Sequence, residues 1–312
     1  MSELQQSFSW IGPSSDPNDE QVGDLVTPAS LDEAADAEIV LVGEPYDGAV
    51  VSRQGAREGP GAIRSALADT MAATLAGDAV PAIADLGDVV FERGPVTDVH
   101  EQFETVAEQV HDLEAFPVFL GGDNSVSVPN VGPLVEDGRT AVINFDAHLD
   151  CRAVQEEPTS GTPYRQLLDR GLADYVVVGA RDFETSDAYV SYVREQGGTV
   201  IPAADVAQKG VAVIDDVLAA VGEDYDHLYL DVDVDVLDAS IATGVSAPTP
   251  GGLSARELYA LLDELPRRVE LSAAGIVECA PPLDHTNRTA TAASRAVAHL
   301  LAGHAAGRAE RG

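Results

Sequence analysis

The sequence predicts a single-domain, three-layer α/β/α protein in which helices cover both faces of a mostly parallel central sheet. From about residue 37 to the end of the 312-residue chain, short apolar runs alternate with segments of helical periodicity. The apolar runs are continuous and rich in β-branched residues, as expected for strands buried on both faces. No repeat, low-complexity stretch or proline- and glycine-rich linker divides the chain, so we expect one domain.

The elements follow one another in the order that such a sheet requires. Strands are expected at residues 39–42, 117–120, 141–145, 175–178, 227–230 and 275–277. Helices are expected at residues 99–113, 187–196, 211–221, 254–265 and 289–301. Residues 1–36 lack this alternation and are expected to form an irregular N-terminal segment before the α/β domain of residues 37–312.

The composition excludes several classes of partner. The chain has 53 acidic and 18 basic residues, which give a formal net charge of -35. Such a charge repels nucleic acids and anionic membranes. No apolar run approaches the ~20 residues that span a bilayer, no signal peptide is visible, and neither Cys151 nor Cys279 belongs to a CxxC motif. We therefore expect a cytoplasmic protein that binds neither nucleic acid nor membrane and has a surface adapted to high salt.

The first functional motif follows the strand expected at residues 141–145. In an open α/β sheet, ligands bind outside the carboxyl ends of the strands. Asp146, His148 and Asp150 occupy this place, and their side chains point the same way if the strand continues. Two carboxylates and an imidazole are costly to bury without a cation. This favours a metal site; the alternative is an acidic surface turn.

A second acidic motif follows the strand expected at residues 227–230. Asp231, Asp233 and Asp235 alternate with valines, so they are expected to share one face. Each carboxylate would raise the pKa of its neighbours unless a cation were bound. The pattern is typical of a strand with one face in the core and one face on a metal; the alternative is a solvated acidic strand.

Two further strand ends carry weaker signals. Residues 121–125 read Gly-Gly-Asp-Asn-Ser, and the paired glycines allow a tight turn or a close approach. Asn124 is able to offer an amide oxygen, or a polar residue of this segment simply caps the next helix. Glu278 follows the strand at 275–277 and is suited to a cationic N–H group, although a solvated acid is an equal alternative.

Together the strand ends favour a pair of metal ions. Oxygen ligands with a single imidazole suit a hard ion such as Mn²⁺ better than thiolate-bound zinc. Two aspartate clusters suit two ions ~3.5–4 Å apart that activate one water molecule. The sequence therefore predicts a binuclear metal site, with manganese as the expected ion.

These motifs resemble those of the ureohydrolases, the family that includes arginase, agmatinase, proclavaminate amidinohydrolase and formimidoylglutamase. The family's Asp-Ala-His-x-Asp motif appears at residues 146–150, and its Asp-x-Asp-x-x-Asp motif at 233–238. Residues 43–47 and 55–60 resemble its first strand and substrate-side loop, and the resemblance covers nearly the whole chain. It implies an arginase-like catalytic domain over residues 37–312 and a homo-oligomer, usually a trimer or hexamer.

The resemblance also implies the metal ligands. Asp146 and Asp233 would bind both manganese ions, while Asp231 takes the place of a small polar residue of the family motif. The remaining ligands would be His148 and Asp235 for one ion, and Asp150 and Asn124 for the other.

The same resemblance implies the catalytic roles. A hydroxide that bridges the two ions would attack the substrate, and Asp150 would pass its proton to the leaving nitrogen. Glu278 would orient the N–H groups of the substrate.

Two departures from the family pattern resemble formimidoylglutamase more than arginase. The family usually has a histidine where this chain has Asn124, a weaker neutral ligand whose ion should bind less tightly. Arginase and agmatinase have a histidine that assists guanidine hydrolysis where this chain has Ser160. The resemblance thus implies hydrolysis of N-formimidoyl-L-glutamate to L-glutamate and formamide.

The dianionic glutamate part of that substrate needs cationic and polar partners. Arg152, Ser160 and Arg181 are the first candidates to contact this small-molecule substrate, and Arg53, Arg57 and Arg165 are further ones. A solvated surface position is the alternative for each arginine. Agmatinase or another guanidine hydrolase is the alternative activity. A metal-binding pseudoenzyme with a structural or regulatory role is the alternative from another class.

Overall fold

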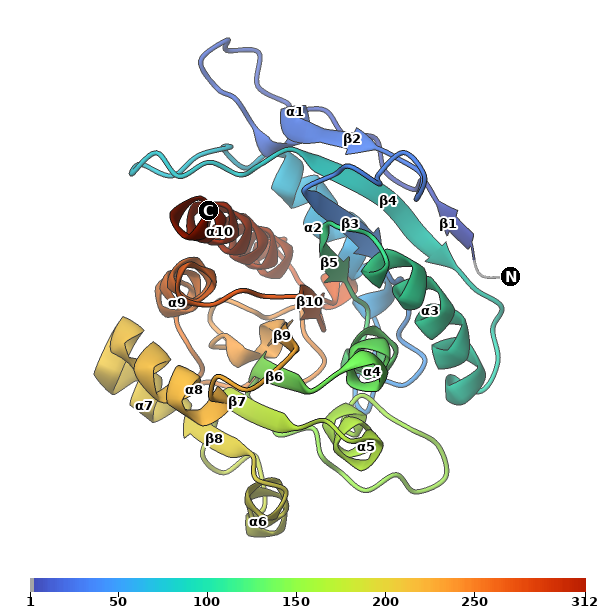
Figure 1. The fold of residues 1–312 in the computed structure, drawn as a ribbon, viewed down its shortest axis with the longest axis vertical. Helices are drawn as coiled ribbons and strands as arrows, with labels where there is room; N and C mark the ends of the chain where they lie inside the picture. Colours follow the sequence, from blue (N-terminus) through green and yellow to red (C-terminus); the bar gives the residue numbers. More distant parts are fainter. Residues whose placement is uncertain (1–2) are drawn as a thin grey trace.

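A computed structural model describes residues 3–312, and its helices and strands form the predicted three layers (Figure 1). The strands are β1 (Glu3–Gln5), β2 (Val26–Pro28), β3 (Ile39–Gly43), β4 (Ile83–Val90), β5 (Phe116–Leu120), β6 (Thr140–Phe145), β7 (Asp174–Ala180), β8 (Thr199–Pro202), β9 (His227–Asp233) and β10 (Ala273–Val277). The helices are α1 (Val22–Leu25), α2 (Gly59–Ala68), α3 (Val96–His111), α4 (Ser127–Asp137), α5 (Pro163–Arg170), α6 (Asp187–Glu195), α7 (Ala203–Lys209), α8 (Val213–Val221), α9 (Ala255–Arg268) and α10 (Arg288–Arg311).

The strands form one sheet in the order β1-β4-β3-β5-β10-β9-β6-β7-β8, and β2 also pairs with β4. Every pairing is parallel except that of β1 with β4. This confirms the predicted mostly parallel sheet. In the middle of the sheet, Val277 of β10 lies opposite Asp233 of β9, and Phe145 of β6 lies opposite Val232. The carboxyl ends of these neighbouring strands therefore meet at one edge.

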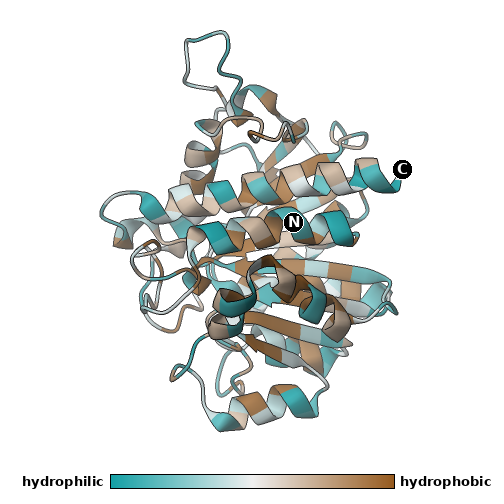
Figure 2. Ribbon diagram, turned by 90° about the vertical axis from the view of Figure 1, so that its left-hand side faces the viewer, coloured by the Kyte–Doolittle hydropathy of each residue, from teal (hydrophilic) through white to brown (hydrophobic). Residues whose placement is uncertain are grey.

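Helices cover both faces of the sheet (Figure 1). On one face, α2, α8, α9 and α10 pack in a core that contains Ile143 of β6; on the other, α3, α4 and α5 pack in a core that contains Val142. Adjacent residues of β6 point to opposite faces, so both faces of the strand are buried. Figure 2 shows the apolar strands inside and polar residues gathered on helices and loops. No helix in residues 3–312 combines the length and the apolar character needed to cross a membrane.

The N-terminal segment is more ordered than expected from the sequence. Residues 1–36 were expected to be irregular, but β1 and β2 both pair with β4. The indole Nε1 of Trp10 donates a hydrogen bond of 2.6 Å to the buried carboxylate of Asp85 on β4. Arg64 of α2 donates to the same carboxylate. This buried contact fixes the segment against the sheet.

Candidate active site

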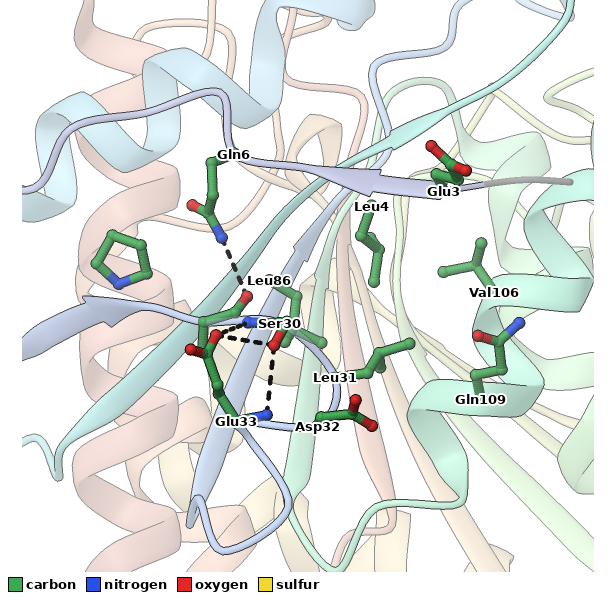
Figure 3. Close-up of a pocket in the computed structure, with 12 residues that line it drawn as sticks. Glu3, Leu4, Gln6, Ser30, Leu31, Asp32, Glu33, Leu86, Val106 and Gln109 are labelled. Atoms are coloured by element: carbon green, nitrogen blue, oxygen red, sulfur yellow. Dashed lines mark hydrogen bonds between the residues drawn. The ribbon is translucent and has the colours of Figure 1, made fainter.

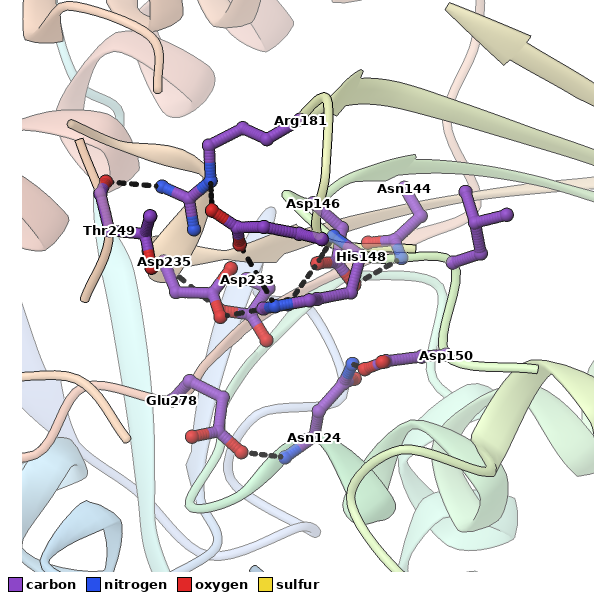
Figure 4. Close-up of polar contacts among 12 residues, drawn as sticks. Asn124, Asn144, Asp146, His148, Asp150, Arg181, Asp233, Asp235, Thr249 and Glu278 are labelled. Atoms are coloured by element: carbon purple, nitrogen blue, oxygen red, sulfur yellow. Dashed lines mark hydrogen bonds and ion pairs between the residues drawn. The ribbon is translucent and has the colours of Figure 1, made fainter. Parts of the chain in front are cut away.

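The predicted site residues gather at the carboxyl ends of four neighbouring strands, β5, β10, β9 and β6 (Figure 4). Asp146 follows the last residue of β6, Asp233 ends β9, and Glu278 follows β10. Asn124 begins a short 3₁₀ helix after β5. Sheet topology therefore brings together segments that are far apart in the sequence.

One group of possible ligands contains Asp146, His148 and Asp235. The Nδ1 atom of His148 lies 3.1 Å from Oδ2 of Asp235 and 3.5 Å from Oδ1 of Asp146. The backbone N–H of His148 also donates to Oδ1 of Asp146 at 2.7 Å. The strand ends at Phe145 and does not continue through the motif, yet these side chains still converge.

A second group contains Asp146, Asp150 and Asp233. In each group the ligand atoms lie within 4.8 Å of one another, and Asp146 belongs to both. Asp150 has a positive φ of 40°, which turns its carboxylate back toward the group. The structure thus places two sites side by side that share one carboxylate. Asp231, although two residues before Asp233, belongs to neither group.

The electrostatics of the two groups are unfavourable without a cation. Burial, and then the charges of Asp235 and Asp146, raise the pKa of Asp233 well above its usual value. Burial and the neighbouring charge of Asp146 do the same to the pKa of Asp150. Burial lowers the pKa of His148, but the charges and hydrogen bonds of Asp235 and Asp146 together outweigh burial and raise this pKa to about 12. Among residues 3–312, the charge of His148 offsets that of the neighbouring carboxylates, and despite burial the charges of His148 and Arg181 lower the pKa of Asp235.

Asn124 and Glu278 meet at the edge of the second group (Figure 4). The backbone N–H of Asn124 donates to Oε1 of Glu278 at 3.0 Å, while Oε2 of Glu278 is buried without a partner. The Nδ2 atom of Asn124 donates to Oδ2 of Asp150 at 2.6 Å. In this orientation its nitrogen, not its oxygen, faces the ligand group. The cap of the short 3₁₀ helix is Asp123, whose side chain accepts from the backbone N–H of Ser125.

Arg152 and Ser160, the predicted substrate contacts, line the cavity above these groups. The cavity has a volume of about 160 Å³, and His148, Asp150, Asp233, Asp235 and Glu278 form its floor. Arg152 is exposed and lies over Gly161, where an added Cβ would come within 3.0 Å of its side chain. Ser160 is nearly buried, and its Oγ accepts the backbone N–H of Val51 at 3.2 Å.

Arg181 is absent from the lining of this cavity, and its guanidinium points toward Thr249 (Figure 4). Its guanidinium donates to the carbonyl oxygen of Thr249 at 2.8 Å, and its Nε lies 3.1 Å from Oε1 of Glu184. The other oxygen of Glu184 lies 3.3 Å from Nε2 of His148. In this structure Arg181 contacts the carboxylate beside His148, and its substrate contact stays a prediction. Glu184 was missed because the sequence offered no signal beyond one more acid in an acidic chain.

A larger cavity of about 580 Å³ lies between the N-terminal strands and α3 (Figure 3). Glu33 in its lining accepts from both the backbone N–H and the hydroxyl of Ser30, and Gln6 donates to the backbone carbonyls of Ala29 and Asp85. No metal-ligand group of the described residues lies in its lining. The smaller cavity at the strand ends is therefore the candidate active site.

Comparison with known proteins agrees with this choice. The model of the arginase family matches residues 37–303. A formimidoylglutamase from Halobacterium salinarum is 48% identical over 305 residues, which cover 96% of this chain and 99% of that protein. A formimidoylglutamase from Bacillus subtilis is 34% identical, over 84% of this chain and 86% of the relative.

Solved structures have the same fold. The crystal structure of the Bacillus subtilis formimidoylglutamase superimposes with a TM-score of 0.86 at 30% identity and covers 93% of both chains. Trypanosoma cruzi formiminoglutamase with Mn²⁺ gives a TM-score of 0.82 at 28% identity, over 92% of this chain and 99% of that one. The family match over most of the chain, together with these relatives, confirms that the chain belongs to the arginase family.

Proposed function

We propose that the protein is a formimidoylglutamase that hydrolyses N-formimidoyl-L-glutamate to L-glutamate and formamide with two manganese ions. The observation that carries this proposal is the pair of buried ligand groups that share Asp146 below a small cavity. The relatives named formimidoylglutamase, at up to 48% identity, support the substrate. Ser160, in place of the histidine of guanidine hydrolases, supports it further.

The donor set fits manganese. Buried carboxylates with raised pKa values and an unpaired buried oxygen on Asp235 are costly unless a cation lies among them. Asp146 and Asp233 would bind both ions, because Asp146 belongs to both groups and the charges of both groups act on Asp233. The remaining ligands would be His148 and Asp235 for one ion, and Asp150 and Asn124 for the other.

The reaction adds water to the formimidoyl carbon, breaks the bond from this carbon to the glutamate nitrogen, and leaves that nitrogen with one more proton. When bound, the two ions would lower the pKa of a shared water molecule and so supply the nucleophile. Asp150, partly exposed in the floor of the cavity, would carry a proton to the leaving nitrogen. The unpaired Oε2 of Glu278 would accept an N–H of the formimidoyl group.

A substrate panel tests the proposed activity. With Mn²⁺, formimidoylglutamate should be hydrolysed, while agmatine, arginine and guanidinopropionate should react far more slowly. The guanidine substrates belong in the panel because relatives named guanidinopropionase and agmatinase are 32% and 30% identical. Faster turnover of a guanidine would overturn the substrate assignment. No turnover of any amidine or guanidine would favour the pseudoenzyme.

Arg152 is proposed to bind a carboxylate of the substrate. It is the one arginine in the lining of the cavity, and it has no acidic partner among residues 3–312. Arg152→Gln should raise KM by about 10- to 100-fold, the ~1.5–3 kcal/mol of a hydrogen bond to a charged group, with a smaller change in kcat. Steady-state kinetics measures this. Arg194→Gln, at an exposed position of α6, is the control and should leave KM unchanged.

Asn124 is proposed to be the weakest of the ligands. Asn124→His should lower the Kd of the looser ion by about tenfold, because an imidazole binds a first-row divalent ion better than a neutral amide. Full activity should then be reached at a lower Mn²⁺ concentration. Titration of both proteins with Mn²⁺, followed by electron paramagnetic resonance of the free ion, measures the two affinities. Identical affinities in the two proteins would mean that Asn124 is not a ligand.

We also propose a homo-oligomer in the cytoplasm. Residues 255–312, mainly α9 and α10, contain seven arginines and seven acidic residues, so the net charge of -35 lies in the rest of the chain. Beside α10, a groove of about 610 Å³ is lined by apolar side chains that include Met71 and the fully exposed Leu75. A second copy would meet least repulsion on this face. Light scattering in concentrated salt gives the mass and tests the assembly.

A further inference from the structure

A buried chain of polar side chains lies behind Asn124. The hydroxyls of Ser127 and Tyr164 lie 2.5 Å and 2.6 Å from the same oxygen, Oδ2, of Asp231. Ser127 Oγ also lies 2.8 Å from Oδ1 of Asn124. Asp231, Ser127 and Tyr164 are completely buried and Asn124 is 1% exposed, so no bulk water completes these contacts. The chain connects the core to the second ligand group.

The hydroxyl of Ser127 has a single hydrogen and two neighbouring oxygens. A carboxylate accepts hydrogen bonds only, and a bond to a charged acceptor is shorter and stronger than one to a neutral amide. The shorter contact of Ser127 is the one to Asp231. The hydrogen of Ser127 is therefore committed to Asp231, and only lone pairs of its oxygen face Asn124.

This polarity decides which end of the Asn124 amide faces the metal site. An amide nitrogen and oxygen have nearly the same shape, and their orientation follows from the hydrogen-bond network. Because the oxygen of Ser127 offers only lone pairs, the favourable partner is the amide nitrogen of Asn124. The amide oxygen then points toward Asp150, where two oxygens would repel each other unless a cation lies between them. A bound ion thus satisfies every member of the network at once.

We infer that Asp231 is a positioning residue, which acts through Ser127 to orient the Asn124 amide with its oxygen toward the second metal ion. This inference rests on the proposed two-ion site. It gives Asp231 a role although its carboxylate belongs to neither ligand group. It also explains why the buried residue at this position is an acid. A neutral residue would not hold the hydrogen of Ser127, which would then be free to bond to Asn124.

Asp231→Asn should reverse the polarity of the network without changing its shape. The backbone N–H of Val232 donates to Oδ1 of Asp231 at 3.1 Å, so an introduced amide keeps its oxygen there and places its NH₂ group toward Ser127. Ser127 then donates to the oxygen of Asn124, and the nitrogen of Asn124 turns to Asp150. This arrangement is satisfied without a metal ion and competes with binding of the second ion.

Mn²⁺ titration of the chelated full-length protein tests this inference. Asp231→Asn should keep one ion at wild-type affinity and raise the Kd of the second by about 10- to 100-fold, the usual effect of losing an outer-shell partner. Ser127→Ala should also weaken the second ion, because it removes the link. Tyr164→Phe removes a hydrogen bond from the same carboxylate but leaves Ser127 in place, so it should bind both ions as the wild type does.

The outcomes separate positioning from a general structural role. Selective loss of the second ion in Asp231→Asn, with an unchanged melting temperature of the metal-free protein, supports the inference. Wild-type affinity in Asp231→Asn overturns it, as does equal weakening of both ions or an equal effect of Tyr164→Phe. A wild-type protein that binds a single ion refutes the two-ion site of the proposed function, and the positioning role with it.

Discussion

Replacing Asp233 with alanine should abolish binding of both manganese ions and lower kcat/KM by more than about 10³-fold. This loss exceeds the ~10- to 100-fold effect of removing a residue that only hydrogen-bonds to a metal ligand. Asp233 ends β9 within the second ligand group, and the charges of Asp235, Asp146 and Asp150 all act on it. Its removal therefore affects both sites at once. Exhaustive chelation of the wild type should have the same effect on activity, and Mn²⁺ should restore it better than Mg²⁺ or Ca²⁺.

Asp233 should support metal binding and activity, but it should lower the stability of the metal-free protein. Burial raises the pKa of Asp233 in the fold, so its ionisation at neutral pH favours the unfolded chain. The stability that depends on its proton is present below the unfolded pKa of about 3.9 and is lost as the pH rises through the raised pKa. Metal-free Asp233→Asn, which keeps the volume and removes the charge, should therefore melt at a higher temperature than the metal-free wild type.

Calorimetry with and without Mn²⁺ measures both effects. Saturating Mn²⁺ should raise the melting temperature of the wild type by about 5–10 °C and that of Asp233→Asn far less. Asp231→Ala is the matched control, because it removes a buried acid two residues away and should retain one ion. Equal loss of both ions in Asp231→Ala and Asp233→Ala would contradict the assignment of Asp233, rather than Asp231, as the ligand of both ions.

The strands were predictable where the chain is continuously apolar. Runs such as residues 141–145 are buried on both faces, and the structure confirms them as strands. β4 escaped prediction because Asp85, Gly87 and Asp88 interrupt its apolar pattern. Those acids are tolerated because Arg64, completely buried, binds both of them, at 2.8 Å and 2.6 Å. Such a pairing joins distant segments and leaves no local signal.

The helices were predictable where the local sequence pattern is amphipathic and free of proline and glycine. The amphipathic pattern of residues 99–113 predicted α3, although its boundaries differ by up to three residues. α4 was missed because it contains Pro129, Gly132 and Pro133, which disfavour a helix locally. The burial of Val131 and Leu134 against the sheet overrides this low propensity.

The sequence predicted which residues gather at the candidate site better than it predicted the contacts among their side chains. The position of Asp146, Asp233 and Glu278 after apolar runs was enough to bring them to one edge of a parallel sheet. The contact between Glu184 and His148 was not predictable, because it depends on how the loop after β7 folds back over the site. The contacts of Asp231 were not predictable either, since its carboxylate belongs to neither ligand group and instead accepts from Ser127 and Tyr164.

Activity and thermal stability should rise steeply with salt concentration. The 53 acidic residues face only 18 basic ones, and the ion pairs of the described residues leave most of this charge unbalanced. Charges repel over a Debye length of ~10 Å at 0.1 M salt but only ~3 Å at 1 M. We expect the melting temperature to rise by on the order of 10 °C over this range, the effect of several kcal/mol of relieved repulsion in a domain of this size.

Thermal melts in KCl at fixed Mn²⁺ measure this response, and an equal osmolarity of a neutral solute separates screening from a general effect of cosolvent. The matched variant changes Glu108, Glu195 and Glu223 to glutamine; all three are exposed and lie outside the candidate site. Because it removes three repelling charges, its melting curve at low salt should lie above that of the wild type, and the two should converge at high salt. A melting temperature that is flat from low to molar salt would contradict the salt-adapted surface, while leaving the metal site and its chemistry untouched.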